Sequence, residues 1–268
     1  MTDYDEWRVV KRASQKIRYE TIIKMINKIA ISKDCALDIG CGNGYFATKI
    51  GQYFKKIIAI DIDSTKIQRC KQRFNNENVL FFKQDFITDE IECNQLDLIT
   101  ALEMIFYLPQ EYWDSFFSKC KKLLKPNGLF VFSMNILTSD GDKNRYKKVI
   151  EEIKKDFNVF KVCKIHRKVY YKIEMPLLYF INSVEYIEKV KLFYSNDWKS
   201  KSYSNNCVVD RLLKSDFFFQ KVIVIFLKLV AEFLLRSKLL YRLLTFFSSL
   251  FAPKKTFSQI VLYCKPKL

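Results

Sequence analysis

Hydrophobic and polar positions along the first half of the chain follow two periods, one typical of helices and one typical of strands. Short apolar runs predict strands at residues 35–40, 56–61, 78–83, 96–103 and 128–134. Amphipathic stretches predict helices at residues 8–30, 64–74 and 111–124, and a shorter helical stretch that ends near Phe54. Strands separated by such helices form βαβ units, so we expect an α/β protein with a parallel sheet and helices on both of its faces.

The pattern changes after residue 135. A helix is predicted at residues 144–157, a strand-rich segment at 158–174, mostly helix at 176–252 and a last strand at 256–264. The simplest arrangement is a seven-stranded sheet whose final hairpin is split by a helical insertion. We therefore expect four parts, which are an N-terminal helical lid (1–33), a core (34–175), a helical insertion (176–255) and a closing strand of the core (256–268).

The net charge of +17 is concentrated in the second half of the chain. Residues 1–135 carry 20 Lys and Arg against 17 Asp and Glu, whereas residues 136–268 carry 26 against 12. A basic surplus attracts polyanions, either nucleic acid or an anionic lipid surface. The same surplus is also typical of the lysine-rich composition that an AT-rich genome produces. The hydrophobic content of 49% excludes a disordered chain.

The cysteine and histidine content limits the chemistry that is available. Eight cysteines lie at irregular spacing with no CxxC pair, and the N-terminus is acidic and unlike a signal peptide. We therefore expect reduced thiols in a cytoplasmic protein rather than a disulfide framework. His166 is the only histidine, so a metal site built on histidines is excluded and we expect no metal.

Glycine marks one site. The chain has only 6 glycines, and Gly40, Gly42 and Gly44 lie within five positions, where a hydrophobic strand runs into a predicted helix. Glycine lets the backbone turn sharply and lets a ligand approach closely. The loop departs from the dinucleotide fingerprint because Tyr45 stands where GxGxxG needs its last glycine, and it lacks the Lys-Ser/Thr ending of a P-loop.

With this loop the chain resembles the class I S-adenosylmethionine-dependent methyltransferases. Residues 38–44 (DIGCGNG) match the first motif of that family, and Asp61 ends the second strand where the family places an acid that holds the ribose. Residues 83–86 (KQDF), 97–99 (DLI) and 125–128 (KPNG) match later motifs in the same order. The resemblance implies a Rossmann-like seven-stranded methyltransferase sheet and S-adenosyl-L-methionine as the cofactor.

The resemblance also implies the residues of the site. The expected cofactor-binding residues follow the first four strands: Asp38, Gly40, Cys41, Gly42, Asn43, Gly44, Asp61, Ile62, Asp85, Phe86 and Leu102. Glu103 and Tyr107 follow the fourth strand, and we expect them to face the methyl group as catalytic residues, although they could simply line the cofactor pocket. The segment 102–109 (LEMIFYLP) is similar to the NodS-like N-methyltransferases, which act on amino-sugar oligosaccharides.

These observations favour an enzyme that methylates an N or O atom of a small-molecule or glycan acceptor, with lipid-linked acceptors included. Residues 217–251 combine a wide apolar face with Lys and Arg, which is typical of an interfacial membrane helix and equally of helices packed in a core or dimer. We therefore expect a cytoplasmic protein, with peripheral attachment to the inner face of the membrane as one alternative. An RNA methyltransferase and a non-catalytic scaffold are the competing functions. Nucleic acid is the less favoured partner because long aliphatic runs interrupt the basic residues. The oligomeric state stays open.

Overall fold

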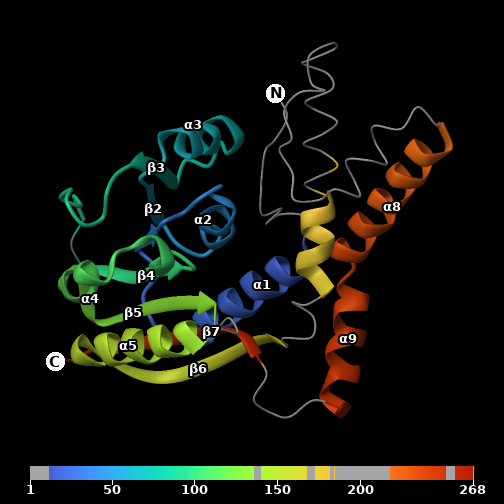
Figure 1. The fold of residues 1–268 in the computed structure, drawn as a ribbon. Coiled ribbons are helices and arrows are strands. Elements are labelled where there is room, and N and C mark those ends of the chain that lie inside the picture. Colours follow the sequence, from blue (N-terminus) through green and yellow to red (C-terminus); the bar gives the residue numbers. More distant parts are fainter. Residues whose placement is uncertain are drawn as a thin grey trace. The chain divides into compact units, whose positions relative to one another are not determined.

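A computed structural model shows a seven-stranded sheet with the strand order β3-β2-β1-β4-β5-β7-β6 (Figure 1). It describes residues 12–93, 95–135, 140–167, 173–181, 184, 218–251 and 257–267. The strands are β1 (Cys35–Ile39), β2 (Lys56–Asp61), β3 (Val79–Lys83), β4 (Leu96–Leu102), β5 (Leu124–Asn135), β6 (Phe157–Arg167) and β7 (Phe257–Pro266). The predicted α/β class and the number of strands are confirmed. β5 starts four residues earlier than expected, because it takes in the Pro126–Gly128 segment.

The topology brings the ends of the central strands together. β1 pairs in parallel with β2 and with β4, β2 with β3, and β4 with β5, whereas β7 runs antiparallel to β5. From β1 the chain first adds β2 and β3 on one side of β1. It then crosses to the other side of β1 and adds β4 and β5, so the strand order reverses between β1 and β4. In open α/β sheets, ligands bind outside the carboxyl ends of the strands at such a reversal.

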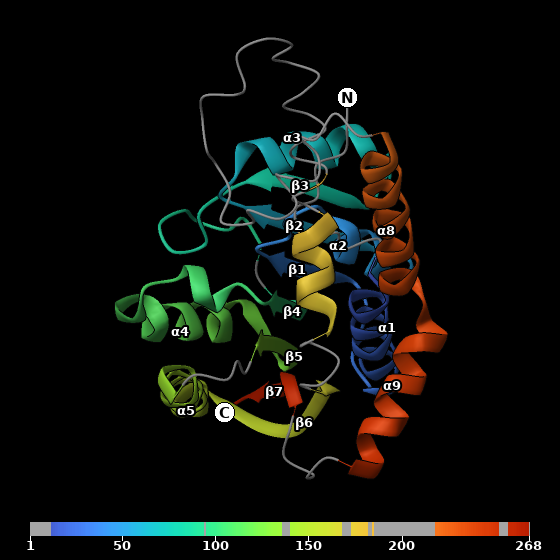
Figure 2. The same cartoon turned by 45° about the vertical axis from the view of Figure 1, so that its right-hand side comes forward.

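Helices cover both faces of the sheet, as Figure 2 shows for α4 and α5 on one side and α1 and α2 on the other. The helices are α1 (Ala13–Lys28), α2 (Tyr45–Ile50), α3 (Ser64–Arg73), α4 (Trp113–Leu123), α5 (Asp140–Asp156), α8 (Phe218–Arg236) and α9 (Lys238–Phe251). Because strand side chains alternate between faces, Leu37 and Ile39 share a core with Phe116 and Phe117 of α4. The two sides of the sheet are therefore both buried, as in other parallel sheets.

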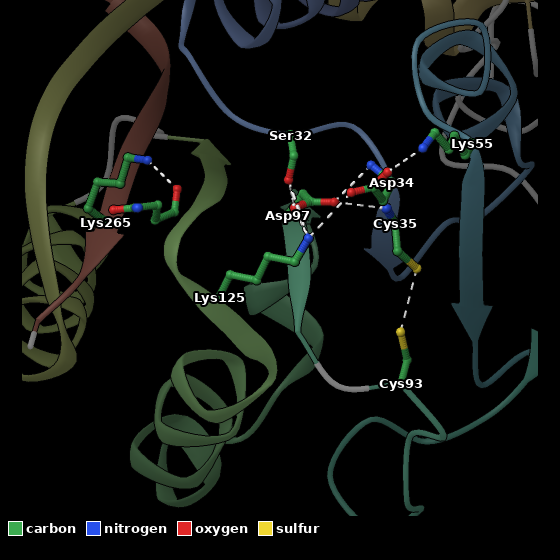
Figure 3. A network of polar contacts seen from close by, with 9 residues as sticks. Ser32, Asp34, Cys35, Lys55, Cys93, Asp97, Lys125 and Lys265 are labelled. Carbon is green, nitrogen blue, oxygen red and sulfur yellow. Dashed lines mark hydrogen bonds and ion pairs between the residues drawn. The ribbon is translucent and has the colours of Figure 1, made fainter.

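A polar network joins the amino ends of β1 and β4, at the edge opposite the glycine loop (Figure 3). Asp97 accepts hydrogen bonds from the backbone N–H groups of Asp34 and Cys35 at 2.8 and 2.9 Å, and also from Ser32 Oγ. Lys125 Nζ lies 2.5 Å from Asp97 Oδ1. Burial alone would raise the pKa of Asp97, but these donors lower it below its ordinary value. The network fixes the start of the strands whose other ends carry the site.

The chain divides into two compact units. One contains residues 18–166 and 257–268, which form the sheet and its helices; the other contains residues 1–17 and 167–256. α1 contributes its first residues to the second unit and the remainder to the first. Of the expected lid (1–33) and insertion (176–255), residues 1–11, 182–183, 185–217 and 252–255 lie outside the described residues. The domain boundaries expected at residues 34 and 176 stay predictions.

The second unit is held together by a buried ion pair and two apolar clusters. Arg12 Nε and Nη2 lie 3.2 and 3.1 Å from the two carboxylate oxygens of Glu174, and Ser14 Oγ also donates to that carboxylate. One apolar cluster packs the helical residues 173–181 against α8, and the other packs the start of α1 against α9. Both α8 and α9 therefore bury one side against their own chain.

Candidate active site

The glycine loop follows β1, and its three glycines all adopt left-handed backbone angles. The φ angles are 70°, 57° and 72° at Gly40, Gly42 and Gly44. A Cβ at Gly44 would lie 2.7 Å from Phe81 Cε1 and 2.8 Å from Cys70 Sγ, so packing alone requires glycine there. A Cβ at Gly42 would meet nothing within 4 Å. The backbone at Gly42 therefore borders open space that a ligand can fill.

Asp61 ends β2 beside this open space. Its Oδ2 accepts a hydrogen bond from the Gly42 N–H at 2.9 Å, and its Oδ1 accepts one from the Asp63 N–H at 3.0 Å. Each carboxylate oxygen keeps a second lone pair, so the group can still accept from a pair of hydroxyls. The next residue, Ile62, is 64% exposed and provides an apolar surface for a flat ring. Both residues lie where the sequence predicts them.

Asp38, Cys41 and Asn43 stabilise the conformation of the glycine loop. Asp38 is buried and accepts a hydrogen bond from Thr100 Oγ1 at 2.6 Å. Burial raises the pKa of Asp38 to about 7, although the Thr100 hydrogen bond acts in the opposite direction. Cys41 is buried, and Asn43 Oδ1 accepts a hydrogen bond from the Tyr45 N–H at 3.2 Å at the start of α2. Asp38 thus anchors the loop to β4.

Glu103 follows β4 directly and is held in an unusual backbone conformation. Its φ of 60° is left-handed, which is uncommon for a residue with a side chain. Its Oε1 accepts a hydrogen bond from Ser133 Oγ at 2.9 Å and lies 3.4 Å from Arg18 Nη1. The Arg18 side chain is only 5% exposed and that of Glu103 is 22% exposed. The carboxylate is therefore fixed at the sheet edge with part of its surface open.

The half-buried Arg145 holds the segment that carries Tyr107. The segment Ile105–Tyr107 is a short 3₁₀ helix, and Arg145 Nη2 of α5 donates to the carbonyls of Ile105 and Phe106 at 3.1 and 3.4 Å. The Arg145 guanidinium also lies 5.2 Å from the centre of the Phe106 ring. Tyr107 itself is 78% exposed. Tyr107 is thus exposed on a segment whose backbone carbonyls Arg145 holds.

The remaining predicted residues divide into two groups. Leu102 is half-buried at the end of β4, and Asp85 is half-buried after β3, where its Oδ1 accepts the Ile87 N–H at 2.8 Å. Phe86 is only 4% exposed and packs edge-on against Phe116 with ring centres 5.1 Å apart. Its ring therefore fills the core, and its expected contact with the cofactor stays a prediction.

Three residues of the site have no recognisable signal in the sequence. Arg18 lies in α1, Ser133 in β5 and Arg145 in α5, and each reaches the segment after β4 from a distant part of the chain. The Nε atom of Arg18 is buried with no hydrogen-bond partner, so this guanidinium can still donate to an anionic group. Tyr19, next to Arg18, packs on Phe46 of α2 with ring centres 5.1 Å apart. Together these contacts place a cation near the glycine loop.

Comparison with known proteins shows which family this arrangement of residues resembles. A family model described as a methyltransferase domain matches residues 36–128, which contain the glycine loop, Asp61 and Glu103. Residues 36–128 of the chain are therefore similar to the methyltransferase domain family. The site fits the cofactor of this family, because the open space at Gly42, the Asp61 carboxylate and the apolar Ile62 suit an amino acid–ribose–adenine ligand. The family match and this fit together support S-adenosylmethionine as the cofactor.

Two curated relatives and one solved structure illustrate the similarity. The phosphoethanolamine N-methyltransferase of Plasmodium falciparum is 31% identical over 42% of this chain and 44% of its own length. The ubiquinone biosynthesis O-methyltransferase of Pasteurella multocida is 27% identical over 44% of this chain and 52% of its own length. The chain thus spans about half the length of the curated relatives it matches.

The solved structure is the N-methyltransferase NodS from Bradyrhizobium japonicum WM9 in complex with S-adenosyl-L-homocysteine. It superposes with a TM-score of 0.54 at 21% identity, over 62% of this chain and 86% of NodS. This likeness supports the predicted Rossmann-like sheet. Among the described residues, no group of three or more His, Cys, Asp or Glu side chains is arranged to hold a metal ion.

Proposed function

We propose that this protein is a methyltransferase that transfers a methyl group from S-adenosylmethionine to an amine or hydroxyl of a small-molecule or glycan acceptor. The acceptor class includes lipid-linked molecules. One observation carries the proposal. The partly exposed carboxylate of Glu103 follows the strand next to the glycine loop, and Ser133 and Arg18 hold it in place. A fixed acceptor of hydrogen bonds at this edge can orient an N–H or O–H group toward the cofactor.

The bound cofactor supplies an electrophilic methyl group on a good leaving group. The protein therefore mainly has to orient the acceptor, and orientation can contribute about 7–11 kcal/mol to lowering the barrier. The acceptor also loses a proton during or after transfer, and a base within hydrogen-bond reach takes it. In our proposal Glu103 accepts the hydrogen bond of the attacking group, and Tyr107 contacts the acceptor from the exposed 3₁₀ segment.

The class of acceptor rests on similarity and on charge. The similarity of residues 102–109 to NodS-like enzymes favours an amino sugar, and the named relatives include both an N- and an O-methyltransferase. An RNA acceptor is the second candidate because the second half of the chain is strongly basic. The exposed surface of α8 and α9 is largely apolar, which favours a lipid-linked acceptor over RNA. A cytoplasmic location on the inner face of a membrane belongs to the same proposal.

Binding of S-adenosyl-L-homocysteine tests the cofactor assignment by calorimetry. Gly42→Arg places a side chain in the open space, and Asp61→Ala removes the acceptor for the ribose, so both variants should lose binding. Asp34→Ala, at the opposite edge of the sheet, is the matched control and should bind like the unaltered chain. Unchanged affinity in both site variants would overturn the cofactor assignment. It would also contradict the proposal that the protein is a methyltransferase.

Turnover tests the roles of the two predicted catalytic residues. Release of S-adenosyl-L-homocysteine is measured with panels of amino sugars, hydroxylated small molecules, lipid-linked glycans and RNA. Glu103→Gln and Tyr107→Phe should lower turnover far more than cofactor affinity, because a group used in the transition state lowers the rate when it is removed. Tyr112→Phe is the control, since Tyr112 is also exposed and lies just beyond the segment. Wild-type turnover in both variants would place the base elsewhere, and turnover on RNA alone would favour the second candidate.

A further inference from the structure

The face of α8 and α9 that is exposed in the described part of the chain is unusually apolar. On α8 the buried positions Val224, Ala231 and Leu235 form one helical stripe. On the opposite side Phe226 and Phe233 are 63% and 71% exposed. The exposed large apolar residues of the two helices are Ile223, Ile225, Phe226, Leu227, Leu229, Val230, Phe233, Leu239, Leu243 and Phe246. We call these ten residues the outer apolar face.

The outer apolar face follows the same helical spacing on both helices. Phe226, Val230 and Phe233 are spaced four and three residues apart on α8, and Leu239, Leu243 and Phe246 have the same spacing on α9. Residues with this spacing lie on one side of a helix. Soluble proteins rarely expose a contiguous apolar surface of this extent without a partner that covers it.

Basic residues border the outer apolar face. Residues 223–246 contain Lys228, Arg236, Lys238 and Arg242 against the single acid Glu232. Lys228, Glu232 and Arg236 follow one another at intervals of four, beside the buried stripe, and Arg236 pairs with Glu232 at 2.9 Å. Long basic side chains keep their stems on apolar surface and extend their charged ends. The charges can therefore reach an anionic layer while the face itself enters an apolar one.

These observations suit one occupant best. The same face of a second copy would present the same basic residues, so it would not supply the negative charge that Arg236 and Arg242 can meet. No helix among those described is long and apolar enough to cross a membrane. A helix with a basic border and a Phe/Leu face instead lies in the plane of the lipid interface.

We propose that α8 and α9 bind the surface of an anionic bilayer, with the outer apolar face in the acyl boundary and Arg236 and Arg242 at the headgroups. This inference gives the proposed methyltransferase a lipid surface as its partner. The biological role of membrane binding rests on the proposed function, whereas the binding itself is argued from α8 and α9. The ion pair of Arg12 with Glu174 and the packing of Ala13 and Ile17 on α9 hold the helices from the protein side. The helices thus have one side for the protein and one for the lipid.

Co-sedimentation with vesicles tests the inference on the full chain. Phosphatidylcholine vesicles that contain phosphatidylglycerol should bring the protein down, whereas phosphatidylcholine alone should not. Phe226→Glu/Phe233→Glu should lower the partition coefficient at least tenfold, because apolar contacts are lost and negative charge is added. Arg236→Gln/Arg242→Gln should lower it about 25-fold, since each basic residue near an anionic surface contributes about fivefold. The matched control is Phe160→Glu/Val162→Glu on the strand β6, where the two side chains are also about half exposed.

Two further measurements keep the inference falsifiable if a variant fails to fold. Raising salt should weaken vesicle binding of the unaltered chain, because screening removes the headgroup attraction. The emission of Phe233→Trp, after that of the unaltered chain with its three tryptophans is subtracted, should shift to the blue on anionic vesicles only, and this change adds no charge. Equal loss of binding in the β6 control, or a folded chain that ignores anionic vesicles, would overturn the inference. So would a concentration-dependent dimer that Phe226→Glu/Phe233→Glu converts to a monomer.

Binding of S-adenosyl-L-homocysteine is measured on the same samples. If vesicle binding fails and cofactor binding persists, the membrane inference falls and the proposed function stands. If cofactor binding fails in a chain that still binds vesicles, the proposed function falls instead.

Discussion

The buried carboxyl of Asp38 makes stability depend on pH in a direction that can be measured. Burial raises the pKa of Asp38 to about 7, against an ordinary value of 3.8 in the unfolded chain. Between these two values the folded protein binds a proton that the unfolded chain has lost, so stability falls as pH rises. The slope is about 1.4 kcal/mol per pH unit, and the whole effect of Asp38 is roughly 4 kcal/mol.

Asp38→Asn removes this titration and keeps an oxygen that can accept from Thr100 Oγ1. The stability of the variant minus that of the unaltered chain should therefore rise by roughly 2.5 kcal/mol from pH 5 to pH 8, and the rise should level off above pH 7. Urea unfolding at several pH values in the absence of cofactor measures the difference, in which other titrating groups cancel. Asp34→Asn is the control, because Lys55 lowers the pKa of Asp34 and its titration lies below this range. Parallel pH profiles for Asp38→Asn and the unaltered chain would refute the reasoning.

Three further predictions concern the loop, the network and the cation. Gly44→Ala should destabilise the fold by about 3 kcal/mol, because the φ of this residue is left-handed and the new Cβ would contact Phe81. Gly42→Ala should destabilise the fold by only about 1 kcal/mol, yet it should weaken S-adenosyl-L-homocysteine binding in calorimetry. Equal unfolding midpoints of the two variants would contradict this prediction. Asp97→Asn should lower the free energy of unfolding by about 3 kcal/mol at neutral pH, because an amide nitrogen would face donors that now meet a carboxylate, and a urea midpoint like that of the unaltered chain would speak against it. Arg18→Ala should weaken S-adenosyl-L-homocysteine binding at least tenfold and Arg18→Lys less, since the buried guanidinium keeps an unused donor, and unchanged affinity in both would remove Arg18 from the site.

The parts of the site that could be predicted are those that lie at the end of a predicted strand. The glycine loop, Asp61 and Glu103 each follow an apolar strand, and parallel strands bring their carboxyl ends to one edge. Arg18, Ser133 and Arg145 could not be predicted, because their contacts depend on tertiary packing between distant elements. Phe86 shows the reverse case. Its position after β3 predicts a contact with the cofactor, and its packing on Phe116 is a tertiary contact that the sequence did not indicate.

The fold was predicted well where the pattern is periodic and less well at its boundaries. The alternation of strands and helices implied the sheet, and the split last hairpin is observed as β6 and β7. The start of β5 was misjudged because Pro and Gly usually mark a turn, whereas here Leu124 already pairs with Leu96. For residues 217–251 the amphipathic pattern was correct, but only the structure shows that the side opposite the outer apolar face is packed on the chain itself.

The place of β7 in the sheet also governs the order in which the protein can fold as it is synthesised. β7 lies between β5 and β6, so β6 cannot join the sheet until residues 257–266 have left the ribosome. During that interval α8 and α9 have already emerged, while the edge of β5 is unpaired and the sheet is incomplete. Nascent chains would therefore expose an apolar helix pair and an open strand edge together, a combination that promotes aggregation. We expect synthesis of this protein to depend on chaperones or on early capture of the helices more strongly than that of a protein whose last two strands form an uninterrupted hairpin.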